Sequence, residues 1–184
     1  MKDHLEMRRH MDLSLYNSVS YSDRSMTASF LLWDLSGRLV GYQTYNPLGS
    51  KNPRNDPHGG KYFTYTHMEN REKKVRTPGV WGLESFNPVS DRVLFLTEGV
   101  FDAVRLHNLG LSAVAVLANS PKLLKPWLRI LPVVTVAVCD GDAAGKQLAG
   151  VADSAVYVEA GKDLGDLTER ELFSFYTKEL SNFT

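Results

Sequence analysis

Three acidic residues stand where two apolar stretches of the sequence end. Glu98 follows the run Val93–Leu96 after one threonine, Asp140 directly follows the run Val133–Cys139, and Asp142 lies two residues further on. Short apolar runs bounded by turn residues predict buried strands. The acids therefore lie at strand ends, which form the ligand crevice of open α/β sheets. Because clustered carboxylates repel one another, they commonly hold a hard divalent cation such as Mg²⁺, which indicates phosphoryl-transfer chemistry.

The spacing of these acids resembles that of the Toprim domain, which primases, type IA and type II topoisomerases and certain nucleases share. The similarity rests on a Glu-Gly-x-x-Asp stretch that begins at Glu98 and an Asp-x-Asp-x-x-Gly stretch that begins at Asp140, and it covers residues 92–167. The resemblance implies that Asp140 and Asp142 bind Mg²⁺, with Mn²⁺ as a substitute. It also implies that Glu98 lies beside the metal and acts as a general acid or base, so that all three acids are catalytic. Because Glu98 comes from a different strand, we expect it to complete the metal site as a ligand or to accept a proton.

Four further polar residues are candidates for a supporting role around these acids: Asp102, Lys146, Lys162 and Asp163. Asp102 is expected either to support the metal ligands or to cap a local turn. Lys146 is placed to reach a phosphate, although a surface lysine on a helix is the ordinary explanation. The pair Lys162-Asp163 resembles a lysine-aspartate stretch of primases, and an ion pair within a turn explains it equally well.

The residues that must position these acids alternate between apolar strands and helical stretches from residue 90 onward, which is typical of a parallel sheet. Strands are expected near 93–97, 113–117, 133–139 and 154–158. Helices are expected at about 100–109, from Ser120 with a break at Pro126, from about Ala143, and from Thr168, which forms a capping box with Glu171, to about Leu180. Helix capping is the alternative explanation for Asp140 and Asp142. The expected fold class is α/β, a Toprim fold of about four parallel strands flanked by helices.

Residues 26–90 predict a small β-rich lobe in front of that sheet. The stretches 28–35 and 38–45 flank a Ser-Gly turn and predict a hairpin, and Tyr62–Thr66 predicts a third strand. The hairpin and the later Thr-Pro-Gly-x-Trp-Gly-Leu segment resemble the lobe that precedes Toprim in phage and plasmid primases. We therefore expect an N-terminal arm over 1–25, the lobe over 26–90 and the Toprim domain with its C-terminal helix over 91–184.

Charge is balanced overall but unevenly distributed. The chain has 21 basic and 21 acidic residues, yet residues 51–76 contain seven basic and three acidic residues, and residues 140–171 contain three basic and eight acidic residues. A basic lobe facing a metal-charged acidic crevice would hold a phosphate backbone, with Tyr62, Phe63 and Tyr65 stacking on bases. A solvated basic loop is the ordinary alternative. The candidate nucleic-acid-binding residues are Arg54, Lys61, Lys73, Lys74, Arg76, Lys122 and Lys125.

Several functional classes are excluded by what the sequence lacks. No run of about 18 apolar residues exists, so no membrane span is expected, and the charged segment Met1–His10 lacks a signal-peptide core. The single cysteine, Cys139, precludes an internal disulfide and, without paired Cys or His ligands, a zinc site. No P-loop is present, so no helicase motor is expected. We expect a cytoplasmic protein, in the bacterial cytoplasm if a phage encodes it.

Three functions follow from these observations. The first is a Mg²⁺-dependent nucleotidyltransferase, a DNA primase-like core that makes RNA primers on single-stranded DNA from nucleoside triphosphates. The second is a small Toprim nuclease that cleaves DNA or RNA, and the third is a non-catalytic module that binds nucleic acid or a replication partner. A primase-like core without its own zinc and helicase modules would take a replicative helicase or a zinc-bearing protein as a partner.

Overall fold

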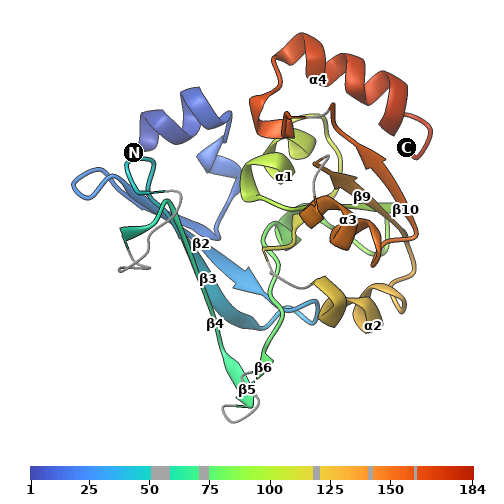
Figure 1. The fold of residues 1–184 in the computed structure, drawn as a ribbon, viewed down its shortest axis with the longest axis horizontal. Coiled ribbons are helices and arrows are strands. Elements are labelled where there is room, and N and C mark those ends of the chain that lie inside the picture. Colours follow the sequence, from blue (N-terminus) through green and yellow to red (C-terminus); the bar gives the residue numbers. More distant parts are fainter. Residues whose placement is uncertain (51–58, 71–74, 118–120, 141–142, 160) are drawn as a thin grey trace. The chain divides into compact units, whose positions relative to one another are not determined.

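The chain forms two compact units, Met1–Trp81 and Gly82–Thr184 (Figure 1). The computed structural model describes residues 1–50, 59–70, 75–117, 121–140, 143–159 and 161–184. This division includes residues 1–25 in the first unit and residues 82–90 in the second, whereas the sequence placed its expected boundaries after residues 25 and 90. Among the described residues, no helix combines the length and the apolar character that crossing a bilayer requires.

The first unit is built on a four-stranded antiparallel sheet in the order β1-β2-β3-β4. Its strands are β1 (Val19–Ser22), β2 (Thr27–Trp33), β3 (Leu39–Tyr45) and β4 (Tyr62–Thr66), accompanied by the short helices η1 (His4–Arg8) and η2 (Leu13–Leu15) and by the strand pair β5 (Met68–Asn70) and β6 (Val75–Arg76). The hairpin of β2 and β3 and the strand β4 are where the sequence predicted them. The strand β1, which pairs with β2, was not predicted.

The core of the first unit gathers on one face of this sheet. The side chain of Trp81 is fully buried. The centroid of its ring lies 5.9 Å from that of Phe30, in an edge-on arrangement, and 5.0 Å from that of Tyr16. On the same side, the N-terminal segment buries Leu5 and Met11. The Thr-Pro-Gly-x-Trp-Gly-Leu segment thus supplies a central aromatic residue of this core.

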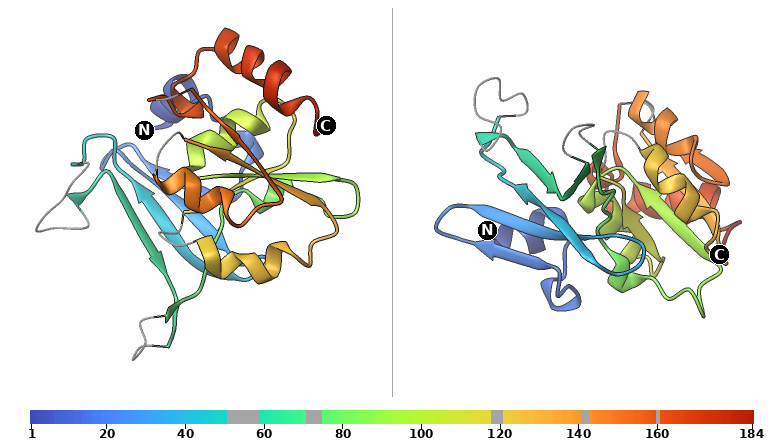
Figure 2. Two further views of the ribbon diagram at one scale, coloured as in Figure 1. Left: turned by 45° about the vertical axis from the view of Figure 1, so that its right-hand side comes forward. Right: turned by 90° about the horizontal axis from the view of Figure 1, so that it is seen from below.

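The second unit is a four-stranded parallel sheet flanked by helices, which confirms the α/β fold class (Figure 2). The strands lie in the order β10 (Ser154–Tyr157), β9 (Val134–Cys139), β7 (Val93–Thr97) and β8 (Ala113–Ala115). The helices are α1 (Val100–His107), α2 (Lys125–Leu128), α3 (Ala143–Ala149) and α4 (Glu169–Phe175), with the short helices η4 (Leu83–Ser85), η5 (Pro121–Leu124), η6 (Leu164–Asp166) and η7 (Tyr176–Leu180).

Local sequence signals determine where these elements begin and end. Gly110 adopts a left-handed φ of +75° after α1, and Pro126 lies at the start of α2, where the chain changes from a tight helical turn to an α-helix. The side chain of Thr168 accepts a hydrogen bond from the Glu171 amide, which completes the predicted capping box of α4. Cys139 is fully buried at the end of β9. The four predicted strands of the sheet agree with the observed ones to within two residues at each end.

Candidate active site

The strand order places Glu98 and Asp140 at the switch point of the sheet, where successive strands are added on opposite sides of β7. From β7 the chain crosses to β8 on one side, and β9 and then β10 are added on the other side. Right-handed crossovers then put α1 and α3 on opposite faces, which opens a crevice at the carboxyl ends of β7 and β9. Glu98 is the residue after β7 and Asp140 is the residue after β9, and these two strands are paired neighbours. The structure therefore brings the two acids to the same edge of the sheet.

Helix α3 packs closely against the end of β9, where Asp140 follows the strand. A Cβ atom added to Gly145 would lie 2.1 Å from the Asp140 carbonyl oxygen and 3.0 Å from the Cβ atom of Cys139. Only glycine allows the helix to start this close to the strand end. Glu98 and Asp140 are both half-buried. The third predicted ligand, Asp142, lies outside the described residues.

The close contact between Gly145 and the end of β9 gives a direct test of how the edge is built. Gly145→Ala should lower the free energy of unfolding by about 1–3 kcal/mol, because the new methyl group overlaps backbone that cannot move without displacing Asp140. The matched control is Gly150→Ala, whose added Cβ would lie no closer than 3.4 Å to any neighbour. Urea denaturation of both variants measures the difference. Equal stability of the two variants would contradict the role assigned to Gly145.

Asp102 links helix α1 to a loop that lies far away in the sequence. Its Oδ2 atom accepts a hydrogen bond from the Gly99 amide at 3.2 Å, and its Oδ1 atom accepts one from the Gly165 amide at 3.0 Å. The sequence left open whether Asp102 supports the metal ligands or caps a turn. The structure shows that it caps the first turn of α1 and also binds the loop of residues 163–167.

The acids at this edge act on one another electrostatically. The pKa of Asp102 is raised from 3.8 to about 8. Burial away from water is the largest cause, and the negative charges of Asp163 and Asp140 raise the pKa further. The hydrogen bonds from the Gly165 and Gly99 amides act in the opposite direction. A Cβ at Gly165 would lie 3.1 Å from Oδ1 of Asp163 and 3.6 Å from Oδ1 of Asp102, so these two carboxylates are near neighbours. The structure therefore adds Asp102 and Asp163 to the edge that carries Asp140.

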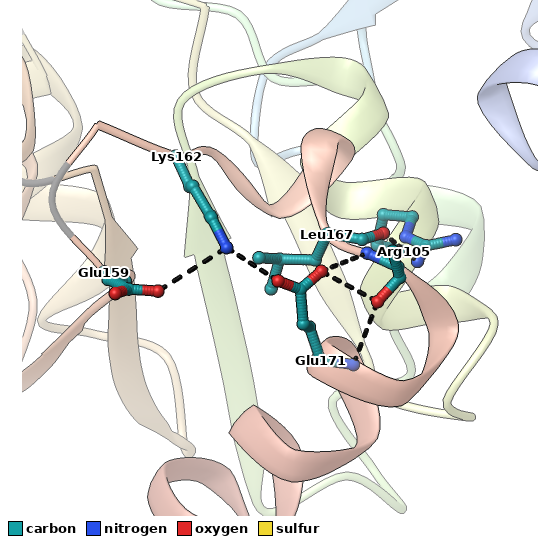
Figure 3. A network of polar contacts seen from close by, with 6 residues as sticks. Arg105, Glu159, Lys162, Leu167 and Glu171 are labelled. Carbon is teal, nitrogen blue, oxygen red and sulfur yellow. Dashed lines mark hydrogen bonds and ion pairs between the residues drawn. The ribbon is translucent and has the colours of Figure 1, made fainter.

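A network of polar contacts fixes the loop that carries Asp163 (Figure 3). The Lys162 ammonium lies 2.6 Å from Oε1 of Glu171 and 3.5 Å from Oε2 of Glu159. The hydrogen bond from Lys162 lowers the pKa of Glu171 most, and hydrogen bonds from the Thr168 amide and hydroxyl lower it further, to about 2. The same hydrogen bond and the negative charge of Glu171 raise the pKa of Lys162. The sequence offered Lys162 as part of a primase-like lysine-aspartate stretch or as a member of a turn ion pair, and in this structure it forms ion pairs with Glu159 and Glu171.

Arg105 also belongs to this region, although the sequence did not single it out. Its side chain is 1% exposed, and its guanidinium donates to Oε1 of Glu169 at 2.6 Å. The guanidinium also donates to the Leu167 carbonyl at 2.8 Å (Figure 3). Together with Asp102, it fastens the loop of residues 163–169 onto α1. The helical spacing could have revealed its burial, because Arg105 lies one turn after Phe101 and therefore on the same buried face of α1.

The predicted nucleic-acid-binding residues differ in their exposure and in their contacts with the rest of the protein. Lys122 and Arg76 are exposed, and the Lys61 ammonium lies 5.7 Å from the centroid of the Tyr62 ring. Lys125 instead donates to the Gly150 carbonyl at 2.9 Å, at the end of α3. Lys146 is exposed on α3. The candidates Arg54, Lys73 and Lys74 lie outside the described residues.

The side chains at this edge have the chemistry of a site for a hard cation. Carboxylate oxygens are the ligands that Mg²⁺ prefers, and a positive ion would offset the repulsion that raises the pKa of Asp102. Within the described ranges, no three His, Cys, Asp or Glu side chains lie close enough together to hold an ion. The expected trio of Glu98, Asp140 and Asp142 is outside that search, because Asp142 is not among the described residues.

Comparison with solved structures identifies the fold. No family model and no curated protein matches the sequence. The structure is similar to the zinc-binding and RNA polymerase domains of the Aquifex aeolicus primase, with a TM-score of 0.59 and 20% identity over 89% of this chain and 41% of that chain. It is similar to the primase fragment of the bacteriophage T7 primase-helicase protein, with a TM-score of 0.57 and 15% identity over 85% of this chain and 65% of that one.

A third similar structure is a DnaG primase catalytic domain bound to single-stranded DNA, with a TM-score of 0.53 and 18% identity over 96% of this chain and 61% of that chain. The chain spans between 41% and 65% of the length of these three solved chains. The expected likeness to primase catalytic cores is thus confirmed at the level of the fold, and most of the chain takes part in it.

Proposed function

We propose that this chain is a primase-like nucleotidyltransferase core that joins ribonucleotides on a single-stranded DNA template with the help of Mg²⁺. The observation that carries the proposal is the placement of Glu98 and Asp140 side by side at the switch point of a sheet with the primase-core fold. Ligands of open α/β sheets bind in this crevice. The neighbour solved with single-stranded DNA supports the choice of template, because its fold is shared over 96% of this chain.

The acids of the sheet edge would each have a defined task. Asp140 and Asp142 would hold Mg²⁺, and Glu98, which comes from the neighbouring strand, would complete the ligand set or accept a proton. When bound, the ion neutralises charge on a triphosphate and on the phosphate under attack. Asp102 would keep α1 and the loop of residues 163–167 in register beside these ligands through its two amide hydrogen bonds.

A single assay tests this function against the alternatives. The protein is incubated with single-stranded DNA, labelled ribonucleotides and Mg²⁺ or Mn²⁺, and both the new oligonucleotides and the length of the template are followed on a gel. We expect short labelled products that disappear when EDTA removes the metal. Shortening of the template without new products would instead favour a nuclease. Binding of the template with neither reaction would favour a non-catalytic module and overturn the proposal.

A further inference from the structure

The antiparallel sheet of the first unit has one packed face and one open face. Along β2, the side chains of Ala28, Phe30 and Leu32 are buried, and the residues between them are half-buried. Partners across an antiparallel pair point to the same face, so the register assigns Tyr45 of β3 to the packed face beside Ala28. That residue is fully buried, and the hydroxyl of its ring contacts His4 and Arg9 of the N-terminal segment.

The same register defines the other side, here called the open face. Strands β2, β3 and β4 contribute two cross-strand rows to it, which are Leu31, Tyr42 and Tyr65 in one row and Ser29, Thr44 and Phe63 in the other. None of these six residues is buried, and none carries a charge. Tyr42, in the middle of β3, is 37% exposed, and Tyr65 of β4 is 47% exposed.

Two tyrosines form the centre of the open face. The rings of Tyr42 and Tyr65 lie 5.6 Å apart between centroids and are tilted by 30°. Within the described part of the chain, neither hydroxyl forms a hydrogen bond to another protein group. Phe63 follows on the same face two residues along β4, at a spacing of about 7 Å. Aromatic side chains gathered on an accessible sheet face indicate a binding surface, because water solvates their faces poorly.

The composition of the face and the charge of the unit favour one class of occupant. Residues 1–81 contain twelve Lys and Arg residues and eight Asp and Glu residues, so the unit attracts a polyanion. The open face itself presents rings and hydroxyl groups with no carboxylate to repel a phosphate. Aromatic residues on a four-stranded antiparallel sheet can stack on the bases of a single strand, whereas the bases of a duplex are already stacked on each other.

We propose that the open face binds single-stranded nucleic acid by stacking bases on Tyr42 and Tyr65, with Phe63 as the next position. This inference rests on the proposed function only in taking nucleic acid as the ligand. It also changes the expected set of stacking residues. Tyr62 belongs to the packed face, where its ring lies 5.2 Å from that of Tyr45, and Tyr42 takes its place.

The test measures binding of a fluorescent oligothymidylate to the full chain by anisotropy, without any catalytic step. Tyr42→Leu and Tyr65→Leu should each weaken binding about tenfold, because each removes one stacking surface while keeping an apolar side chain. Tyr65→Phe should bind like the unaltered chain. The slope of log Kd against log salt should stay the same in all of these variants, because no phosphate contact is lost.

Matched controls are available from exposed tyrosines elsewhere in the chain. Tyr21 is 42% exposed but shares the packed side with Ala28, and Tyr157 is 48% exposed on β10 of the second unit. Tyr21→Leu and Tyr157→Leu should leave the dissociation constant unchanged. Equal losses in the controls and in the open-face variants would overturn the inference, and so would a loss that is the same for duplex DNA.

Two further outcomes separate this inference from the proposed function. Unchanged oligonucleotide binding in Tyr42→Leu and Tyr65→Leu, with primer synthesis intact in the unaltered chain, would overturn the stacking face and leave the function standing. Tyr-dependent binding with no synthesis would do the reverse. If the two variants change only the sedimentation of the protein by itself, the face joins two copies of the chain and the inference is wrong. Circular dichroism melting confirms that each variant is folded.

Discussion

Asp140→Asn is expected to reduce primer synthesis on the order of 10²–10³-fold, the range seen when one preorganised electrostatic group is removed from an active site. An amide keeps the size of the side chain but carries no charge, so it binds Mg²⁺ much more weakly. Glu98→Gln should lose activity in the same way, because Glu98 follows the neighbouring strand at the same edge. Synthesis rates at saturating Mg²⁺ and at tenfold higher Mg²⁺ measure the loss and any rescue.

The control for this prediction lies at the other end of the same sheet. Asp153 precedes β10, and its carboxylate accepts hydrogen bonds from the amide and the hydroxyl of Thr135, both at 2.8 Å. Asp153→Asn therefore makes the same chemical change at the amino edge. We expect it to cost some stability and to leave the synthesis rate of the folded protein unchanged. If Asp140→Asn keeps full activity, or if Asp153→Asn loses as much, the acids at the carboxyl edge are not the reaction centre.

The contribution of Asp102 to the stability of the metal-free protein should fall as the pH rises from about 4 through 8, and Asp102→Asn should remove this contribution. Folding raises the pKa of Asp102 from its ordinary value of 3.8 to about 8. A carboxyl group with a raised pKa favours the folded state fully below the unfolded value, and this contribution is lost as the pH passes the folded value. The difference between the variant and the unaltered chain across this window should be roughly 3 kcal/mol or more.

The measurement is urea denaturation of both proteins in EDTA at intervals between pH 5 and pH 9. At low pH, Asp102→Asn should be slightly less stable, because asparagine can accept only one of the two amide hydrogen bonds well. At high pH the order should reverse. Asp163→Asn should move the transition of Asp102 to lower pH, since it removes the largest of the neighbouring charges that raise the pKa. Parallel pH profiles for Asp102→Asn and the unaltered chain would refute the coupling.

The sequence was informative where the physical signal is local. The buried strands β7 and β9 were predicted because apolar runs of four and seven residues lead to turn residues. The capping box of Thr168 and Glu171 was predicted because both positions lie within one turn of the helix. Strand β1 was missed, because Val19–Ser22 shows little apolar character and gains its order from pairing with β2. Its strand conformation depends on a partner, which no local pattern records.

The residues of the candidate site also differ in how far the sequence alone could identify them. Glu98 and Asp140 were found because each follows its own strand directly. The second amide partner of Asp102 is Gly165, 63 residues away, and only the fold brings the two together. Lys162 shows the opposite case, since its glutamate partners are three and nine residues away and leave it committed to the loop. Arg105 was overlooked because a lone arginine on a helix is normally a surface residue, whereas here the carbonyl of Leu167 and the carboxylate of Glu169 accept its hydrogen bonds.

The position of Cys139 has a practical consequence for the unaltered chain. It is the only thiol in the sequence, it is fully buried, and it lies one residue before Asp140. An alkylating reagent can reach its sulfur only when the end of β9 unfolds locally, so the alkylation rate measures local unfolding at this position. Any ligand that binds Asp140 in the closed state should slow alkylation in proportion to its occupancy. The protein therefore contains its own reporter of ligand binding at the sheet edge.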